Sequence, residues 1–138
     1  EPILYSYKFN VEKPVDVIED KCYLTPMLHL ADLQNPFVLE DRTFPIDYQY
    51  PRKTNYIVNI AIPDGYNVST LPESTKVLLP EELGEFLYKA KQVGNNVQVS
   101  YQFVINSNLV PSKYYNELKT FYNLAIEKQE EKIVFVKS

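Results

Sequence analysis

Apolar and polar residues alternate strictly in several segments of the chain. Between positions 97 and 105 every second residue is apolar and the positions between are mostly polar. Since successive side chains of a β-strand point to opposite faces, this pattern predicts a strand with one buried face. The same alternation predicts strands at residues 3–11 and 54–62. The apolar members of the three segments are Val97, Val99, Tyr101, Phe103 and Ile105; Ile3, Tyr5, Tyr7, Phe9 and Val11; and Tyr56, Val58, Ile60 and Ile62.

Turn residues separate these strands and indicate where the chain reverses. Pro63-Asp64-Gly65 follows the strand at 54–62 and is typical of a turn. Val93-Gly94-Asn95 lies between two further strand-like segments, 85–92 and 96–104, with the spacing of a hairpin that has a short loop. Including shorter segments, we expect about seven to nine strands in all. The shorter segments are residues 22–24, 27–31, 66–68, 75–79 and 132–136.

One segment near the C-terminus has a different period. Residues 112–129 carry apolar side chains at steps of three and four, which predicts an amphipathic helix. Its start is either Pro111 as a first-turn proline or Ser112 as an N-cap. Because the apolar stripe must be covered, we expect it to pack against a sheet. The stripe consists of Tyr115, Leu118, Phe121, Tyr122, Ala125 and Ile126.

These elements predict a mainly β fold, an antiparallel β-sandwich with one C-terminal amphipathic helix followed by a final short strand. The 138 residues fit a single domain spanning 1–138, with 45% hydrophobic and 23% charged residues, as in ordinary globular proteins. Three glycines against twelve tyrosines further favour sheet. Because the chain begins at Glu1 without a methionine, we expect it to be a fragment of a longer multidomain protein.

Charge and hydropathy argue against two classes of partner. The net charge is -4 and there is no basic run, so nucleic acid is not expected as a partner. No apolar stretch approaches the roughly 20 residues that span a bilayer, so no membrane-spanning segment is expected. The first residues do not show the basic-then-apolar pattern of a secretory leader, so we expect none within the given residues.

Cysteine with histidine is the nucleophile–base pair that the composition permits. Cys22 and His29 are each the single residue of their kind. A reactive thiolate needs a cation or a helix N-terminus nearby, whereas Cys22 lies in an apolar, extended segment. In one continuous strand the two side chains would also point to opposite faces, although Pro26 can interrupt that alternation. We therefore expect Cys22 to be a buried packing residue and no catalytic residue to be present.

Other chemistry has weaker support in the sequence. A metal site would need clustered ligands, and the acidic groups Asp16, Glu19 and Asp20, and Glu40 and Asp41, lack the ligand spacing of a known loop. The chain has neither a glycine-rich phosphate loop nor a Gly-x-Ser-x-Gly elbow. We therefore expect no metal and no cofactor. A pair of distant carboxylates acting on sugars stays open, because such residues can come from anywhere in a fold.

The least regular part of the chain is residues 32–53, a long connection of the kind that often carries function. Tyr48 and Tyr50 lie in it, and amphipathic rings suit half-wet contact surfaces for a peptide or a sugar. More often such residues cap the edge of a core. The candidate binding surface is Tyr48, Tyr50 and Arg42.

Several short motifs follow one another along the chain, namely Asp20 to Pro26, Asn35 to Phe37, Glu40 to Asp47, Ile62 to Tyr66, Leu71-Pro72 and Tyr114 to Gln129. Their order and spacing are similar to those of the C-terminal domain of unknown function that follows the transglutaminase-like core in cell-envelope proteins of Bacteroides and its relatives. The similarity extends over nearly the whole chain.

The resemblance implies a Cys, His and Asp triad in a core upstream of residue 1, with no counterpart among the present residues. It therefore implies a non-catalytic accessory domain that stabilises or positions the catalytic core or its substrate. It also implies a periplasmic, cell-surface or secreted location. One alternative is a glycan- or peptide-binding module acting through the loop around Tyr48 and Tyr50. A second alternative is an enzyme in its own right, which requires convergent titratable groups in a cleft.

Overall fold

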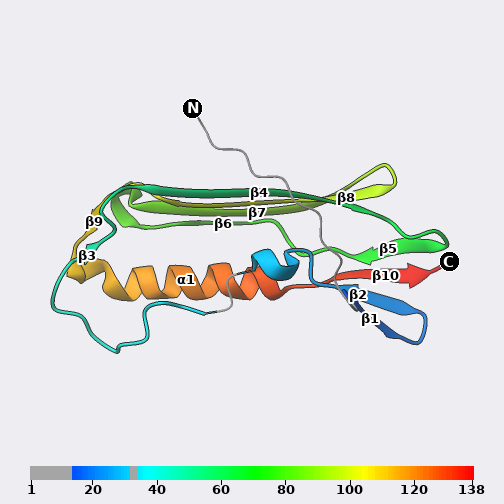
Figure 1. Ribbon diagram of the computed structural model, residues 1–138, viewed down its shortest axis with the longest axis horizontal. Coiled ribbons are helices and arrows are strands. Elements are labelled where there is room, and N and C mark those ends of the chain that lie inside the picture. Colours follow the sequence, from blue (N-terminus) through cyan, green and yellow to red (C-terminus); the bar gives the residue numbers. More distant parts are fainter. Residues whose placement is uncertain (1–13, 32–33) are drawn as a thin grey trace.

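The computed structural model describes residues 14–31 and 34–138. The strand expected at residues 3–11 lies outside them. Within this part of the chain, ten strands, one α-helix and three short 3₁₀ segments form two layers. Figure 1 shows one layer as a long sheet, and the other as helix α1 followed end to end by a smaller sheet.

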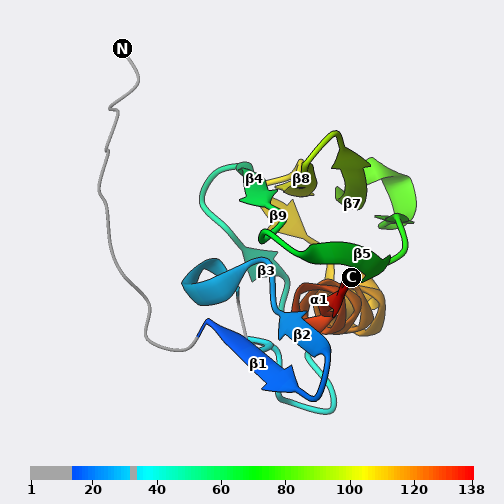
Figure 2. The same cartoon turned by 90° about the vertical axis from the view of Figure 1, so that its right-hand side faces the viewer.

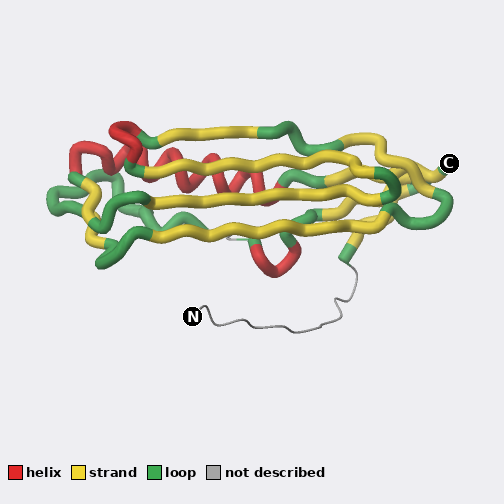
Figure 3. Tube along the Cα trace, turned by 90° about the horizontal axis from the view of Figure 1, so that it is seen from above, coloured by secondary structure: helices red, strands yellow, loops and turns green. Residues whose placement is uncertain are grey.

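The long layer is a four-stranded antiparallel sheet in the order β4-β8-β7-β6. Its strands are β4 (Arg52–Ala61), β8 (Asn96–Ile105), β7 (Gly84–Val93) and β6 (Thr75–Leu78). Seen from above, they run side by side with the helix behind them (Figure 3). The strand predicted at 54–62 and the hairpin around Gly94 are confirmed.

The hairpin turn between β7 and β8 has two residues, Gly94 and Asn95, because Val93 pairs with Asn96. Gly94 has φ +59, the left-handed conformation that two-residue hairpin turns require. This turn sets the register of all ten residue pairs between β7 and β8. Alternate side chains of both strands therefore point to the same inner face.

The smaller sheet has the order β1-β2-β10-β5 and is also antiparallel. Its strands are β1 (Val15–Ile18), β2 (Lys21–Leu24), β10 (Ile133–Lys137) and β5 (Tyr66–Thr70). Figure 2 looks onto this end of the molecule, with the long sheet above and α1 behind. A third, two-stranded pair, β3 (Ile46–Asp47) and β9 (Leu109–Val110), lies at the other end (Figure 1).

The predicted helix is present with a shifted start. α1 spans Tyr115–Glu130, and a 3₁₀ turn at Ser112–Tyr114 precedes it. Pro111 occupies the cap position of that turn without a side-chain hydrogen bond, so neither Pro111 in the first turn nor Ser112 as an N-cap starts the helix. The final strand, β10, follows directly, and the predicted fold class is confirmed.

One predicted strand is wrong. Residues 27–31 contain a 3₁₀ turn at Leu28–Leu30, in which the Leu30 amide donates to the carbonyl of Met27. Leu28 has φ +48, which an extended strand does not allow. Strands β1, β3 and β9 were not expected, and β3 and β9 have only two residues each, too few to show a period.

The hydrophobic core lies between the two layers. Phe86 and Tyr88 on β7 and Val97 on β8 are fully buried, and so are Leu118 and Phe121 of the helix stripe. The stripe predicted for the helix is therefore confirmed as part of the core. Cys22 is buried in the smaller sheet, where it pairs with Val17 and Phe135.

Candidate functional site

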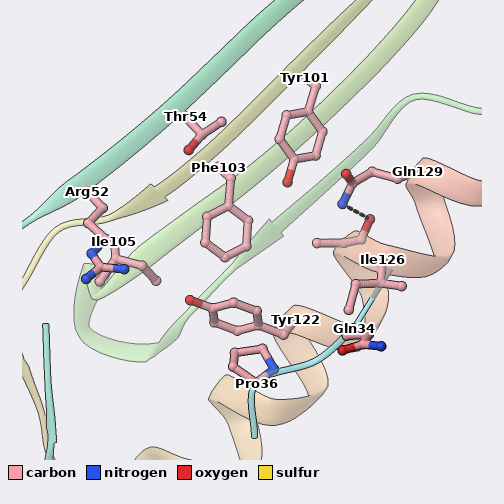
Figure 4. Close-up of a pocket in the computed structure, with 11 residues that line it drawn as sticks. Gln34, Pro36, Arg52, Thr54, Tyr101, Phe103, Ile105, Tyr122, Ile126 and Gln129 are labelled. Atoms are coloured by element: carbon pink, nitrogen blue, oxygen red, sulfur yellow. Dashed lines mark hydrogen bonds between the residues drawn. The ribbon is translucent and has the colours of Figure 1, made fainter. Parts of the chain in front are cut away.

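A cavity of about 310 Å³ lies between the C-terminal half of α1 and the β4 side of the long sheet. Figure 4 shows strand and helix side chains facing each other across it. Aromatic and aliphatic groups form much of the wall, with polar groups between them. The side chains used below are Arg52 and Thr54 of β4, Tyr101 and Phe103 of β8, and Tyr122 and Ile126 of α1.

Strand and helix periodicity explain why these side chains meet. Arg52 and Thr54 are two positions apart, so they share the inner face of β4. Thr54 pairs with Phe103, which places both on the same side of the sheet. Tyr122 and Ile126 are four positions apart and therefore lie on one face of α1.

Arg52 is oriented by two tyrosine rings. Its guanidinium carbon lies 5.2 Å from the ring centre of Tyr48 and 5.6 Å from that of Tyr50. Both distances are within the range of a cation–π interaction. In residues 14–31 and 34–138 Arg52 forms no ion pair. The site therefore holds a positive charge that two aromatic rings position.

Tyr48 ties this cluster to the helix. Its hydroxyl lies 3.0 Å from the hydroxyl of Tyr122, and only 6% of the residue is exposed. Burial, followed by the hydrogen bond with Tyr122, raises the pKa of Tyr48 well above its usual range, while Arg52 and Arg42 oppose the shift. Tyr48 therefore stays neutral and acts as a fixed support for Arg52.

The connection that precedes this cluster is anchored to α1. The Asn35 amide donates to the carbonyl of Lys119 at 2.9 Å, and the buried ring of Phe37 packs edge-on against Tyr122. The Tyr115 hydroxyl donates to the carbonyl of Leu39 at 2.7 Å. One wall of the site is thus held in place by hydrogen bonds as well as by packing.

The three residues predicted to form a binding surface have different environments. Tyr50 is 61% exposed, whereas Tyr48 is buried, so the two rings do not make one flat exposed platform. Arg42 is exposed and donates to the carbonyl of Phe44 at 3.1 Å. Binding through these residues stays a prediction. The structure brings Tyr48 and Tyr50 together through Arg52, which sequence reasoning had missed.

The structure does not bring the residues considered for catalysis together among the residues that it describes. Cys22 is buried, as predicted for a packing residue, and the side chain of His29 lies outside what the structure describes. Asp16 pairs with Lys132 at 3.3 Å. Within residues 14–31 and 34–138, no group of three or more His, Cys, Asp or Glu side chains could hold a metal ion. In the same part of the chain, no helix is long and apolar enough to cross a membrane.

Comparison with protein families gives one match that covers most of the sequence. The family described as "Domain of Unknown Function with solved-structure structure", DUF3858, matches residues 20–135. The chain belongs to the DUF3858 family. This confirms the broader part of the resemblance, namely a domain of unknown function. Among curated proteins no sequence matches the chain.

A solved structure has the same fold as this DUF3858 domain. It is a crystal structure from Parabacteroides distasonis that carries the description "putative protease". The two superpose with a TM-score of 0.60 at 11% sequence identity. The match covers 72% of the present chain and 19% of the Parabacteroides protein. At this identity the likeness shows a shared fold, and the DUF3858 domain corresponds to about a fifth of that longer chain.

Proposed function

We propose that this DUF3858 domain is a non-catalytic accessory domain of a transglutaminase-like or cysteine-protease-like envelope protein. The observation that carries the proposal is the size relation with the Parabacteroides protein. A fold that accounts for 19% of a chain described as a protease is one module among others. In this role the domain stabilises the catalytic core, or positions the core or its substrate.

The environment of Cys22 supports a role without thiol chemistry. A catalytic cysteine acts as an accessible thiolate with an oriented base. Cys22 is buried between Val17 and Phe135 in the middle of the smaller sheet. A substrate could not reach the sulfur without displacing the groups that cover it. We propose a periplasmic, cell-surface or secreted location, which rests on the family resemblance.

The accessory role is tested by comparing the longer protein with and without this domain. If the domain only stabilises the core, its removal lowers the melting temperature and leaves kcat/KM per folded molecule unchanged. If the domain also positions substrate, kcat/KM falls while the core stays folded. A deletion that changes neither quantity would contradict the proposal.

The isolated 138-residue chain gives a second test. It should neither hydrolyse peptides nor cross-link amines to glutamine side chains. Turnover that disappears in Cys22→Ala but persists in Met27→Leu would contradict the proposal, since Met27 is equally well buried. That result would assign catalysis to Cys22.

A second candidate function is that of a binding module. The observation that favours it is the cavity beside Arg52 and the loop that contains Tyr48 and Tyr50. Both a peptide and a glycan can use aromatic rings and a cation.

A further inference from the structure

Within the part of the chain that the structure describes, the cavity lies beside a strand edge that has no partner strand. β4 is the terminal strand of its sheet, and among the described residues it pairs with β8 alone. Along its ten residues, the backbone groups on the outer side have no strand partner in this part of the chain. An exposed edge of this length can accept an extended peptide as an additional strand.

The cavity itself has two chemically different regions. Arg52 and Thr54, at the start of β4, provide a cation and a hydroxyl. Phe103 and Ile126 provide an apolar surface next to them, as Figure 4 shows. A ligand that fits both regions carries an anionic group attached to a small apolar body.

The Arg52 side chain is preorganised to bind such an anion. The rings of Tyr48 and Tyr50 already hold its guanidinium, so less side-chain entropy is lost on binding. The planar guanidinium can donate two parallel hydrogen bonds to one carboxylate.

We propose that this site binds the C-terminal end of an extended peptide. The terminal carboxylate contacts Arg52, the last side chain enters the cavity, and the preceding residues pair with the free edge of β4. A volume of about 310 Å³ suits one aliphatic side chain with its carboxylate and lies at the small end of the roughly 300–1,000 Å³ range of ligand pockets. The free edge favours a peptide over a glycan, because only a peptide can continue the backbone ladder.

The inference goes beyond the accessory role. A peptide can bind here whether or not a catalytic core lies in the same chain. The binding experiment uses the 138-residue chain alone, so its failure is distinguishable from failure of the accessory role.

The test measures fluorescence anisotropy with a fluorescein-labelled hexapeptide, Gly-Ser-Thr-Val-Ser-Leu, carrying either a free C-terminal carboxylate or a C-terminal amide. We expect the amide to bind at least about tenfold more weakly, because it loses a charge-assisted hydrogen bond. Arg52→Gln should weaken binding of the free acid to the level of the amide and leave binding of the amide unchanged.

The matched control is Lys53→Gln. Lys53 is the next residue of β4 and pairs with Val104, so it lies on the opposite face while carrying the same charge. It should leave the ratio between acid and amide unchanged. An equal loss in both variants would mean a non-specific charge effect and would overturn the proposal. Circular dichroism melting of each variant confirms that it is folded.

Two further arms separate peptide from glycan. N-methylation of alternate backbone amides in the peptide should weaken binding, because it blocks pairing with β4; undiminished binding would overturn strand addition. Trigalacturonic acid, which has carboxylates without a peptide backbone, should not displace the peptide. Displacement by this glycan, equal affinity for acid and amide, or absence of binding to either peptide would each overturn the proposal.

Discussion

Strands β7 and β4 of the long sheet have similar alternating sequences, but their inward side chains are buried to different extents. On β7, Phe86 and Tyr88 are completely buried. On β4, Tyr56 and Val58 alternate in the same way but remain half-exposed. Tyr56 even stacks on Tyr101 with 5.8 Å between ring centres, yet only Tyr101 is buried. The inner face is therefore closed over β7 and open over β4.

The difference comes from where α1 lies. Its buried stripe of Leu118, Phe121 and Ala125 packs toward the middle of the sheet. Between α1 and β4 a gap remains, which is the cavity beside Arg52. An alternating pattern therefore tells which face of a strand points inward, whereas the position of the covering element decides whether that face becomes core or binding site.

The largest expected effect is at the closed side. Phe121 is buried and its ring centre lies 5.0 Å from that of Phe103. Phe121→Ala should lower the free energy of unfolding by about 3–5 kcal/mol in urea denaturation, because it leaves a cavity in the core. Leu124→Ala on the same helix is the control, since Leu124 is 41% exposed. Similar losses for both would mean that the helix is not docked by its predicted stripe.

Removing two buried tyrosine hydroxyls should change the stability by less than Phe121→Ala does, and the two changes should differ from each other. Tyr48→Phe removes the hydrogen bond to Tyr122 and should cost about 1 kcal/mol. Tyr88→Phe should cost nothing or stabilise slightly, because the buried Tyr88 hydroxyl has no hydrogen-bond partner among the described residues. Thermal melting of both variants checks this. A larger loss for Tyr88→Phe would show that its hydroxyl has a partner.

The stability of the fold should depend on pH through Tyr48. Since burial and Tyr122 raise the pKa of Tyr48, the unfolded chain releases this proton at lower pH than the folded chain does. The resulting stability is fully present below the ordinary tyrosine pKa of about 10 and is lost as pH rises above it. Tyr48→Phe should therefore lose less stability than the wild type between neutral and strongly alkaline pH in urea titrations. Parallel curves for the two proteins would contradict the assignment.

The smallest effect on stability is expected at Arg52. Arg52→Gln should change the free energy of unfolding by no more than about 0.5 kcal/mol, because the side chain is exposed and makes no ion pair with any described residue. Chemical denaturation checks the value. A loss of several kcal/mol would make Arg52 part of the structural framework rather than of a binding site.

Prediction from the sequence was most successful where a hydrophobic pattern repeats several times. The strands predicted at 54–62 and 97–105 and the stripe around Phe121 each repeat over several residues, so their inward faces could be predicted. β3 and β9 are too short for any period. The 3₁₀ turn at Leu28–Leu30 follows Pro26 and includes a residue with positive φ, which a hydrophobic pattern cannot indicate.

The candidate site was predictable only in part. Tyr48 and Tyr50 were singled out because the connection around them is irregular and aromatic, and in the structure both rings pack against Arg52 of the cavity. Arg52 was missed, since its importance depends on ring distances that exist only after folding. Tyr122 was assigned to the helix stripe, and nothing in the sequence links its hydroxyl to that of Tyr48, 74 positions away.

The central claim is that the closed β7 side maintains the fold while the open β4 side binds. The most direct measurement is a two-dimensional ¹H–¹⁵N NMR titration of the 138-residue chain with the hexapeptide that ends in a free carboxylate. The account predicts shifts concentrated at Arg52, Thr54 and Phe103, with the amides of Phe86 and Tyr88 unchanged. Shifts confined to the smaller sheet or to the outer face of the long sheet, or no shifts at saturating peptide, would contradict it.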